Sequence, residues 1–419
     1  MRDIRILLLL LLFPLLGACA SARMRDDEVD RLFRSSKYLD AAEILKARIQ
    51  AGGPGAPGSE DELLYLLDAG LALHQAGEAE ASNAYFALAE KHVSLNGYTS
   101  VSEEAGTLLT SENTKVYRGE DFERVLIHVY KALNYAILGG LEDALVEARL
   151  VNRRLEEMKR EGEKRYKQNA FARYVAAILY EAEGEYNDAY VDYKKVHELE
   201  PAFQPVGRDL WRMAAALGMR DEMDRWKSSF QLSDEDAQRR TNSPLGLKSG
   251  RGEVVLIFQN GISPVKRPDP AFPSLPDFVP RYNPVREAEV SLNGSVVGRT
   301  VVLHDIEATA ISNLKERKLA MAAKRVAGRV TKAIVADQIR RKTKNEALAF
   351  LTEVALIVSD QADTRSWSLL PRDFQIARIP VDAGVHEVRV QPIGGGSAES
   401  RTVQVDAGKK VFLSFRYLP

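Results

Sequence analysis

The chain of 419 residues has one cysteine, Cys19, and its six histidines are scattered without metal-ligand spacing. A single thiol excludes an internal disulfide framework and any zinc site that needs several thiolates. The sequence also has no Walker loop, no dinucleotide fingerprint and no G-x-S-x-G nucleophile turn. We therefore expect no metal, no cofactor and no enzymatic activity.

An excess of charge of either sign is also missing. The formal net charge is −1 at pH 7, with 28% charged and 45% hydrophobic residues. This composition is typical of an ordinary folded protein and gives the chain as a whole no bias toward polyanions. After the first twenty residues, no run reaches the ~18 uncharged apolar residues that indicate a membrane-spanning helix. The length suggests two or three domains.

The start of the chain has the charged-then-apolar layout that is typical of secretory signals. Arg2 and Arg5 precede an apolar run at 6–16, which is too short to span a bilayer. The run ends in Leu16-Gly17-Ala18-Cys19, which resembles the bacterial lipobox. The resemblance implies a signal peptide over 1–18 and a mature chain whose Cys19 carries a diacylglycerol and an amino-terminal acyl chain such as palmitate. A plain signal peptide with a coincidental cysteine, or a buried apolar helix, is the alternative.

The lipobox resemblance also bears on location. The residue after Cys19 is Ala20, not the aspartate that favours inner-membrane retention in enterobacteria. We therefore expect the chain at the outer membrane, facing the periplasm, with the Cys19 lipid as its membrane attachment. Nucleic acid is not an expected partner, because that compartment lacks it.

Residues 19–232 are predicted to form a helical repeat domain. The clearest unit, 170–203, alternates small and large residues and resembles a tetratricopeptide repeat at nearly every consensus position. We interpret the repeats as a concave surface that holds a protein partner, with a purely structural spacer as the alternative. Weaker copies and a capping pair lie at 38–45, 70–89, 132–148 and 207–230. The signature residues of the clearest unit are Ala177, Tyr180, Gly184, Tyr186, Ala189, Tyr193 and Pro201.

A polar linker at 233–252 is expected to lead into a second domain at 253–419. The β-branched run at 253–258 indicates a strand. Seven prolines between 261 and 284 exclude a helix or a central strand there. The aromatic residues of this segment either lie in the core of their own domain or form a strap that recognises a partner.

The rest of this domain alternates between strands and one long helix. Asn293-Gly294 between alternating segments predicts a hairpin over 286–303. The segments 379–392 and 401–418 alternate well and predict a terminal hairpin. The expected fold is therefore mainly α: a tetratricopeptide-like α-solenoid followed by a smaller α+β domain that ends in antiparallel strands.

A helix is predicted from Asp305 to about Lys344, and it is strongly basic. From Lys315 onward it carries eleven lysines and arginines against two acidic residues. A basic amphipathic helix can bind an anionic surface, here one of the cell envelope, and a solvated helix face is the alternative. The candidate contact residues are Lys324, Arg325, Arg329 and Lys332.

The segment 362–371 holds the densest cluster of unusual residues: Asp363, Arg365, Trp367 and Pro371. Together with Asn260-Gly261 and Lys266, which form an "NG-x-x-P-x-K" turn, this "ADxRxWxxLP" motif resembles a family of uncharacterised bacterial lipoproteins with tetratricopeptide-like repeats. The cluster has no nucleophile, general base or metal-ligand spacing. We interpret it as a rigid structural corner.

The features combine into one functional hypothesis. The chain is expected to be a lipid-anchored periplasmic scaffold or adaptor that binds a protein partner through its helical repeats, in assembly of the cell envelope. The alternative is an envelope hydrolase or transferase with a site near Asp363, Arg365 and Trp367.

Overall fold

The structure, a computed structural model, describes residues 27–52, 55–96, 115–160, 169–233, 250–343 and 362–419. The lipidation candidate Cys19 lies outside these residues. In the part of the chain that is described, none of the helices has both the length and the apolar character needed to cross a bilayer.

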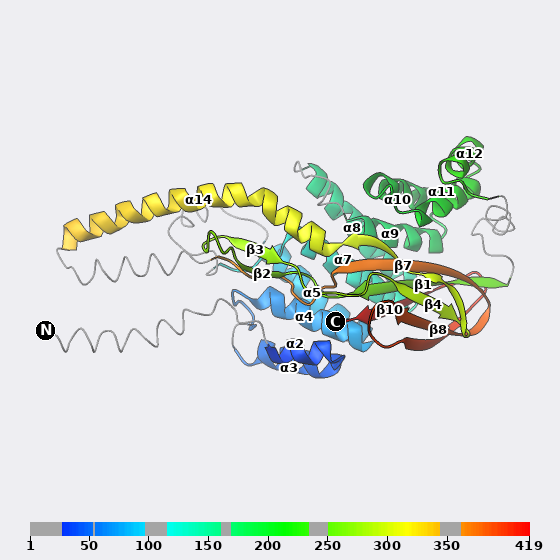
Figure 1. The fold of residues 1–419 in the computed structure, drawn as a ribbon, viewed down its shortest axis with the longest axis horizontal. Helices are drawn as coiled ribbons and strands as arrows, with labels where there is room; N and C mark the ends of the chain where they lie inside the picture. Colours follow the sequence, from blue (N-terminus) through cyan, green and yellow to red (C-terminus); the bar gives the residue numbers. More distant parts are fainter. Residues whose placement is uncertain (1–26, 53–54, 97–114, 161–168, 234–249, 344–361) are drawn as a thin grey trace.

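The amino-terminal half is a stack of helical pairs (Figure 1). Within each pair the two helices contact each other, and the second helix contacts the first helix of the next pair. This nearest-neighbour pattern defines an α-solenoid and confirms the tetratricopeptide-like prediction. The helices are α2 (Asp27–Arg34), α3 (Tyr38–Gln50), α4 (Glu62–Ala76), α5 (Ala79–Asn96), α7 (Asp121–Ile137), α8 (Leu141–Arg160), α9 (Ala170–Ala182), α10 (Tyr186–Leu199), α11 (Pro205–Ala216) and α12 (Arg220–Ser229).

The clearest repeat is the pair α9 and α10. Ala177 and Ala189 are completely buried, so the two helices approach closely, and Tyr193 is buried with them. Gly184 adopts a φ of +79°, a left-handed conformation that glycine accepts at little cost, and it opens the turn between the helices. The other signature residues flank this turn or follow α10: Tyr180, Tyr186 and Pro201.

The carboxy-terminal half holds two four-stranded sheets and a two-stranded ribbon. The central sheet has the order β10-β1-β7-β6, the outer sheet has the order β5-β4-β8-β9, and the ribbon pairs β2 with β3. The strands are β1 (Arg251–Asn260), β2 (Val265–Pro268), β3 (Pro276–Val279), β4 (Ala288–Leu292), β5 (Ser295–Arg299), β6 (Val301–Asp305), β7 (Asp373–Asp382), β8 (Gly384–Pro392), β9 (Glu399–Val405) and β10 (Lys410–Tyr417).

The central sheet lies between the helices and the outer sheet, so both of its faces are buried. On β1, Val255 and Ile257 belong to the core that the sheet shares with the helices. Val254, Leu256 and Phe258 belong to the core that it shares with the outer sheet. This division follows from the two-residue period of a strand. Because α4 and α7 contact β10 and α9 contacts β6, the chain's own strands cover one face of the repeats.

The last strand differs from the prediction. A terminal hairpin of 379–392 with 401–418 was expected, but only β8 and β9 form such a hairpin. Strand β10 leaves it and pairs in parallel with β1, and β7 pairs with β1 on the other side. The prediction failed because alternation shows that a segment is a strand without showing which strand is its neighbour. Strand β1 also begins at Arg251, within the expected linker 233–252.

The remaining predictions for this half are largely confirmed. The hairpin over 286–303 is β4 with β5, although its last residues continue into β6 of the central sheet. The basic helix is α14 (Ile306–Thr343), which runs past the β2–β3 ribbon and away from the sheets (Figure 1). In the proline-rich segment Phe278 is buried, whereas Phe272 and Tyr282 are exposed. The prediction that the aromatic residues lie in the core is therefore correct for Phe278 alone among these three.

Candidate functional site

The motif residues Asp363, Arg365 and Trp367 lie where the central sheet meets the repeats. The Arg365 guanidinium donates from Nε and NH2 to the two oxygens of Asp363, at 2.9 and 2.8 Å. It also donates from NH1 to the main-chain oxygen of Lys115, at 2.7 Å, just before α7. Charge-assisted bidentate pairs of this kind fix geometry as well as energy. Arg365 therefore ties the segment before β7 to the repeat domain.

Trp367 is the largest fully buried side chain of the motif. Its ring lies against Phe86 of α5 and Tyr130 of α7, with centroid distances of 5.9 and 5.7 Å. Burying an aromatic ring of this size is a large apolar contribution to stability. Pro371 follows in the same segment, is also buried, and precedes β7. The sequence alone predicted a rigid corner here, and the structure adds that its contacts are with the repeats.

The carboxyl group of Glu123, on α7, accepts a hydrogen bond from the main chain of the motif. Trp367 N donates to Glu123 Oε1 at 2.7 Å, and the Tyr117 hydroxyl donates to Oε2 at 2.6 Å. Burial and the nearby Glu120 carboxylate raise the pKa of Glu123 to about 7, although these donors counteract the rise. Glu123 therefore titrates near neutral pH at the centre of this contact.

Glu120 brings the second motif to the same place. Lys266, from the "NG-x-x-P-x-K" turn, donates from Nζ to Glu120 Oε1 at 2.9 Å, and Arg317 of α14 donates to Oε2 at 2.6 Å. Burial by itself would raise the pKa of Glu120, but these two cations outweigh burial and lower it to about 2. Lys266 also donates to the main-chain oxygen of Arg365 at 3.3 Å. The two motifs behind the family resemblance thus meet through the hydrogen bond from Lys266 to Arg365, beside the neighbouring carboxylates of Glu120 and Glu123.

We call this set the motif junction: Tyr117, Glu120, Glu123, Lys266, Asp363, Arg365 and Trp367. A small cavity beside it has a volume of about 100 Å³ and is lined by Lys266, Arg365, Asp30 and Asp68 together with hydroxyl and apolar side chains. Ligand sites are generally several times larger. Its lining includes no histidine or cysteine. The contacts described above engage the motif side chains with the repeats, which gives the motif a positioning role.

A second set of buried polar contacts joins the other end of the repeats to the central sheet. Arg378 of β7 lies at its centre and contacts Asp209 at 2.8 Å and Glu253 at 2.6 Å. Lys410 of β10 lies 2.9 Å from Glu181. Every side chain in the set is at most 9% exposed. We call it the ion network, and its members are Glu181 on α9, Asp209 and Arg212 on α11, Glu253 on β1, Arg378 on β7 and Lys410 on β10.

The ion network balances three carboxylates with three cations. Burial by itself would raise the pKa of Glu181, but Arg212, Arg378 and Lys410 outweigh burial and hold it well below its usual value. The pKa of Glu253 is lowered in the same way by Arg378 and Lys410. Because removing ions from water is costly, such a network fixes one arrangement of the two halves more than it adds stability.

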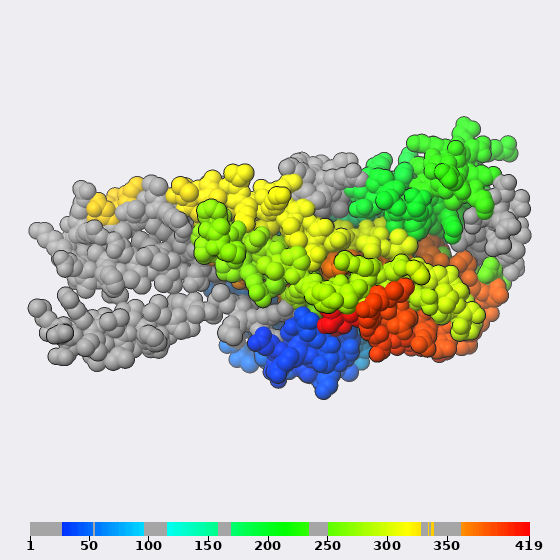
Figure 2. Space-filling model, in the orientation of Figure 1, coloured from blue at the N-terminus to red at the C-terminus, as the bar shows by residue number. Residues whose placement is uncertain are grey.

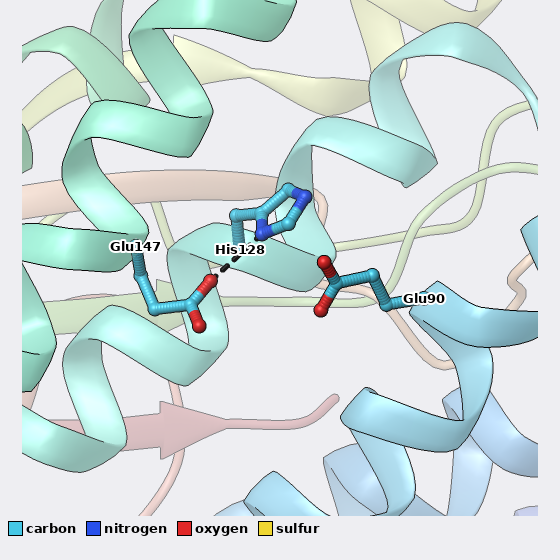
Figure 3. Close-up of side chains that lie close together, drawn as sticks. All are labelled: Glu90, His128 and Glu147. Carbon is cyan, nitrogen blue, oxygen red and sulfur yellow. Dashed lines mark hydrogen bonds and ion pairs between the residues drawn. The ribbon is translucent and has the colours of Figure 1, made fainter. Parts of the chain in front are cut away.

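A third cluster has the spacing of a metal site. Glu90 of α5, His128 of α7 and Glu147 of α8 place their ligand atoms within 4.8 Å of one another (Figure 3). The Lys131 ammonium, however, lies 2.7 Å from Glu90 Oε2 and 2.6 Å from Glu147 Oε1. Burial by itself would raise the pKa of Glu147, but His128 and Lys131 outweigh burial and lower it. Lysine thus supplies the positive charge that a metal would bring, and the donor set fits an ion-pair cluster.

The candidates for an anionic-surface contact lie on α14. Lys324 is exposed and Arg325 is half-buried. The side chains of Arg329 and Lys332 lie outside the described part of the structure. The backbone places all four on the stretch of α14 beyond Arg317.

Comparison with known proteins gives only weak similarities. No protein-family model and no curated protein matches the chain. The crystal structure of MamA is similar over 52% of this chain and 100% of its own, with a TM-score of 0.34 and 12% identity. A Podosopora anserina kinesin light chain with TPR-like repeats covers 51% of this chain and 94% of its own, with a TM-score of 0.33 and 14% identity. A Rap protein in complex with competence and sporulation factor covers 52% and 58%, with a TM-score of 0.29 and 14% identity. These similarities assign no function to this chain.

Sequence reasoning missed the partners of the motif and the whole ion network. Glu120 and Glu123 look like ordinary acidic residues in the first turn of a helix, where they are common. Glu253 and Lys410 gave the clearer signal, because each is a charged residue at the edge of an apolar strand. A charge in such a position is buried only with a partner.

Proposed function

We propose that the protein is a lipid-anchored scaffold of the bacterial cell envelope that holds a protein partner. The observation that carries this proposal is the joining of solenoid and sheets into one body through the motif junction and the ion network. Both sets consist of side chains that bind one another, which suits a rigid positioning element. The lipobox-like segment before Cys19 supports attachment to a membrane, and Ala20 supports the outer membrane.

The arrangement of the sheets changes where a partner would bind. The repeats turn α4, α7 and α9 toward the central sheet, so that face is filled within the molecule. The repeats therefore serve mainly as the framework, and partner recognition falls to surfaces that the sheets and outer helices leave open. Anchoring at Cys19 would keep such a surface close to the membrane.

Two experiments test this proposal. Crosslinking in intact cells, followed by capture of the full chain, should recover one specific envelope protein, and recovery of none would overturn the scaffold function. Replacing Cys19 with alanine should leave an unprocessed precursor that takes up no labelled palmitate. Normal membrane fractionation and labelling of that variant would overturn the lipid anchor.

We also propose that the basic stretch of α14 contacts an anionic envelope surface. In support, α14 extends away from the sheets (Figure 1), and Leu319 and Val326 are 83% and 62% exposed beside Lys324 and Arg325. Co-sedimentation of a detergent-free chain without residues 1–19 with phosphatidylglycerol vesicles should fall strongly when that chain carries K324E/R325E. Equal binding by both proteins would overturn the contact.

A further inference from the structure

Strand β5 is an edge strand of the outer sheet that keeps apolar side chains in solvent. It pairs with β4 on one side, and among the described residues no strand pairs with its other side. All five of its residues are exposed, with Val296 and Val297 at 60% and 46%. An edge of this kind is a template for another strand, and proteins usually protect it with charges or proline.

The opposite edge of the same sheet shows that protection. Strand β9 has charged and polar residues in its exposed positions, and Arg401 pairs with Glu399 at 2.7 Å. Strand β5 reads Ser-Val-Val-Gly-Arg and has only its last residue charged. The two edges therefore differ in chemistry, and only β5 presents an apolar, unprotected rim.

A cleft of about 520 Å³ runs beside β5, between that strand, β7 and the end of the repeats. Its volume is within the range of sites that bind ligands. Figure 1 shows α11 and α12 at the same end of the molecule as β4 and β8. Val297 and Val301 form part of one wall, Pro205 and Phe230 part of the other. Gly298 also lines the cleft, and a Cβ added there would meet no atom within 4 Å, so the space beside this residue is open.

The charged residues that line the cleft are mostly basic. Arg208, Arg299 and Arg378 line it, together with one carboxylate, Asp209. Asp209 and Arg378 both belong to the ion network, where Arg212 and Arg378 lie 2.8 Å from Asp209, so their charges compensate each other within it. Arg208 and Arg299 are then the further charged residues of the lining. Arg299 pairs with Glu287 at 2.6 Å, but both side chains are over one-third exposed, and such a pair contributes little. The cleft thus favours an anionic occupant.

We propose that this cleft binds an extended, acidic segment of the partner protein, which adds to the outer sheet as a fifth strand beside β5. The proposal rests on the scaffold function above and specifies its recognition surface. Main-chain hydrogen bonds to β5 would give affinity, as in other cases of strand addition. Alternate side chains would give specificity: apolar ones against Val297 and Val301, and carboxylates toward Arg208 and Arg299.

Peptide binding to the full chain in detergent tests the proposal directly. The probe is a fluorescein-labelled heptapeptide, Gly-Val-Glu-Val-Glu-Val-Thr. It should bind at least about tenfold more tightly than the same peptide with lysine in place of glutamate, or with alternate amides methylated. Hydrogen exchange of amides 295–302 should slow on binding. Equal binding of all three peptides, or no protection of β5, would overturn the proposal.

Matched variants locate the site. V297D should weaken binding about tenfold or more. V385D changes a more exposed valine of β8, outside the cleft, and should leave binding unchanged. R208A should weaken binding about threefold, and R225A on α12 should not. The assignment would be overturned if V297D and V385D, or R208A and R225A, had equal effects on peptide binding. It would also be overturned if the chain bound no peptide and instead formed a dimer that V297D disrupts.

The two proposals fail differently. If V297D captures the envelope partner from cells as well as wild type does, the cleft assignment is wrong and the scaffold function stands. If wild type captures no partner at all, the scaffold function fails whatever the peptides do.

Discussion

The motif junction and the ion network join the same two halves of the molecule by different chemistry. At the motif junction, a guanidinium group, a main-chain N–H and an aromatic ring from one short segment contact α7 and the residues just before it. In the ion network, six charged side chains come from two helices and three strands. The first leaves a recognisable motif in the sequence, and the second leaves none. A contact can therefore be essential to a fold without being visible as a motif.

The ion network should show the largest effect of a single substitution. R378M removes one of the three cations, so that two cations remain to balance the three buried carboxylates of Glu181, Asp209 and Glu253. We expect a loss of about 3–5 kcal/mol in unfolding free energy, measured by urea denaturation. The control is R149M, which removes a largely exposed pair with Glu185 and should cost no more than about 1 kcal/mol. Similar losses in the two variants would show that the network is not a principal contact.

Glu123 of the motif junction and the carboxylates of the ion network should respond to pH in opposite directions. The pKa of Glu123 rises from 4.5 to about 7 on folding, so the folded state holds this proton more tightly than the unfolded chain. The contribution of Glu123 to the unfolding free energy therefore decreases as pH rises from about 4.5 to 7, by up to about 3 kcal/mol. Glu181 and Glu253 have lowered pKa values, so their contribution is lost as pH falls below about 4.5.

Urea titrations of wild type and E123Q at several pH values measure this difference. The decrease in unfolding free energy above pH 4.5 should be smaller in E123Q than in wild type. The decrease below pH 4.5 should be the same in both proteins. Glu120, whose pKa is lowered to about 2, belongs with the acid-side group although it lies at the motif junction. Parallel curves for the two proteins would contradict the assignment of Glu123.

Trp367 should show a smaller effect that depends on the replacement. Its Nε1 is buried and has no hydrogen-bond acceptor among the described residues. W367F loses volume but also removes this unsatisfied donor, so we expect a net cost of about 1 kcal/mol. W367L loses the ring contacts to Phe86 and Tyr130 and should cost about 3 kcal/mol. If both cost the same, as judged by thermal unfolding, ring packing is not the main role of Trp367.

Arg317 should show the smallest effect. It shares Glu120 with Lys266, but its side chain is 43% exposed whereas that of Lys266 is 5% exposed. Solvent already screens this charge, so R317A should cost only about 0.5 kcal/mol. K266M serves as the comparison and should cost several times more, because Glu120 would lose its buried partner. A larger cost for R317A than for K266M would show that Arg317 of α14, and not Lys266, is the main partner of Glu120.

The sequence predicted local features well and long-range ones poorly. Gly184, Ala177 and Ala189 identified a helical pair because their spacing is set within one unit. The "NG" of Asn293-Gly294 identified a hairpin for the same reason. By contrast, Arg378 looked like an ordinary strand residue, because its partners are 125 to 197 residues away.

The burial of the central sheet on both faces has a signal in the sequence. The run 254–258 is apolar at every position, which is typical of a strand buried on both faces. A second apolar layer on the far side of β1 follows from that run, and the repeats provide the apolar surface that forms it. The neighbour of β10, however, depends on tertiary packing that no local pattern encodes.

The parallel pairing of β10 with β1 has a consequence for how the protein is made. His74 of α4 contacts Ser414 at 3.2 Å across 340 residues, and Arg34 of α2 donates to the main-chain oxygen of Pro419 at 3.2 Å. Figure 2 accordingly shows the earliest described helices against the last strand. The side of α4 and α7 that faces the central sheet is therefore covered only after β10 has been made and has docked. Contacts this distant close slowly, so folding should pass through a long-lived stage that ends only when β10 docks beside β1.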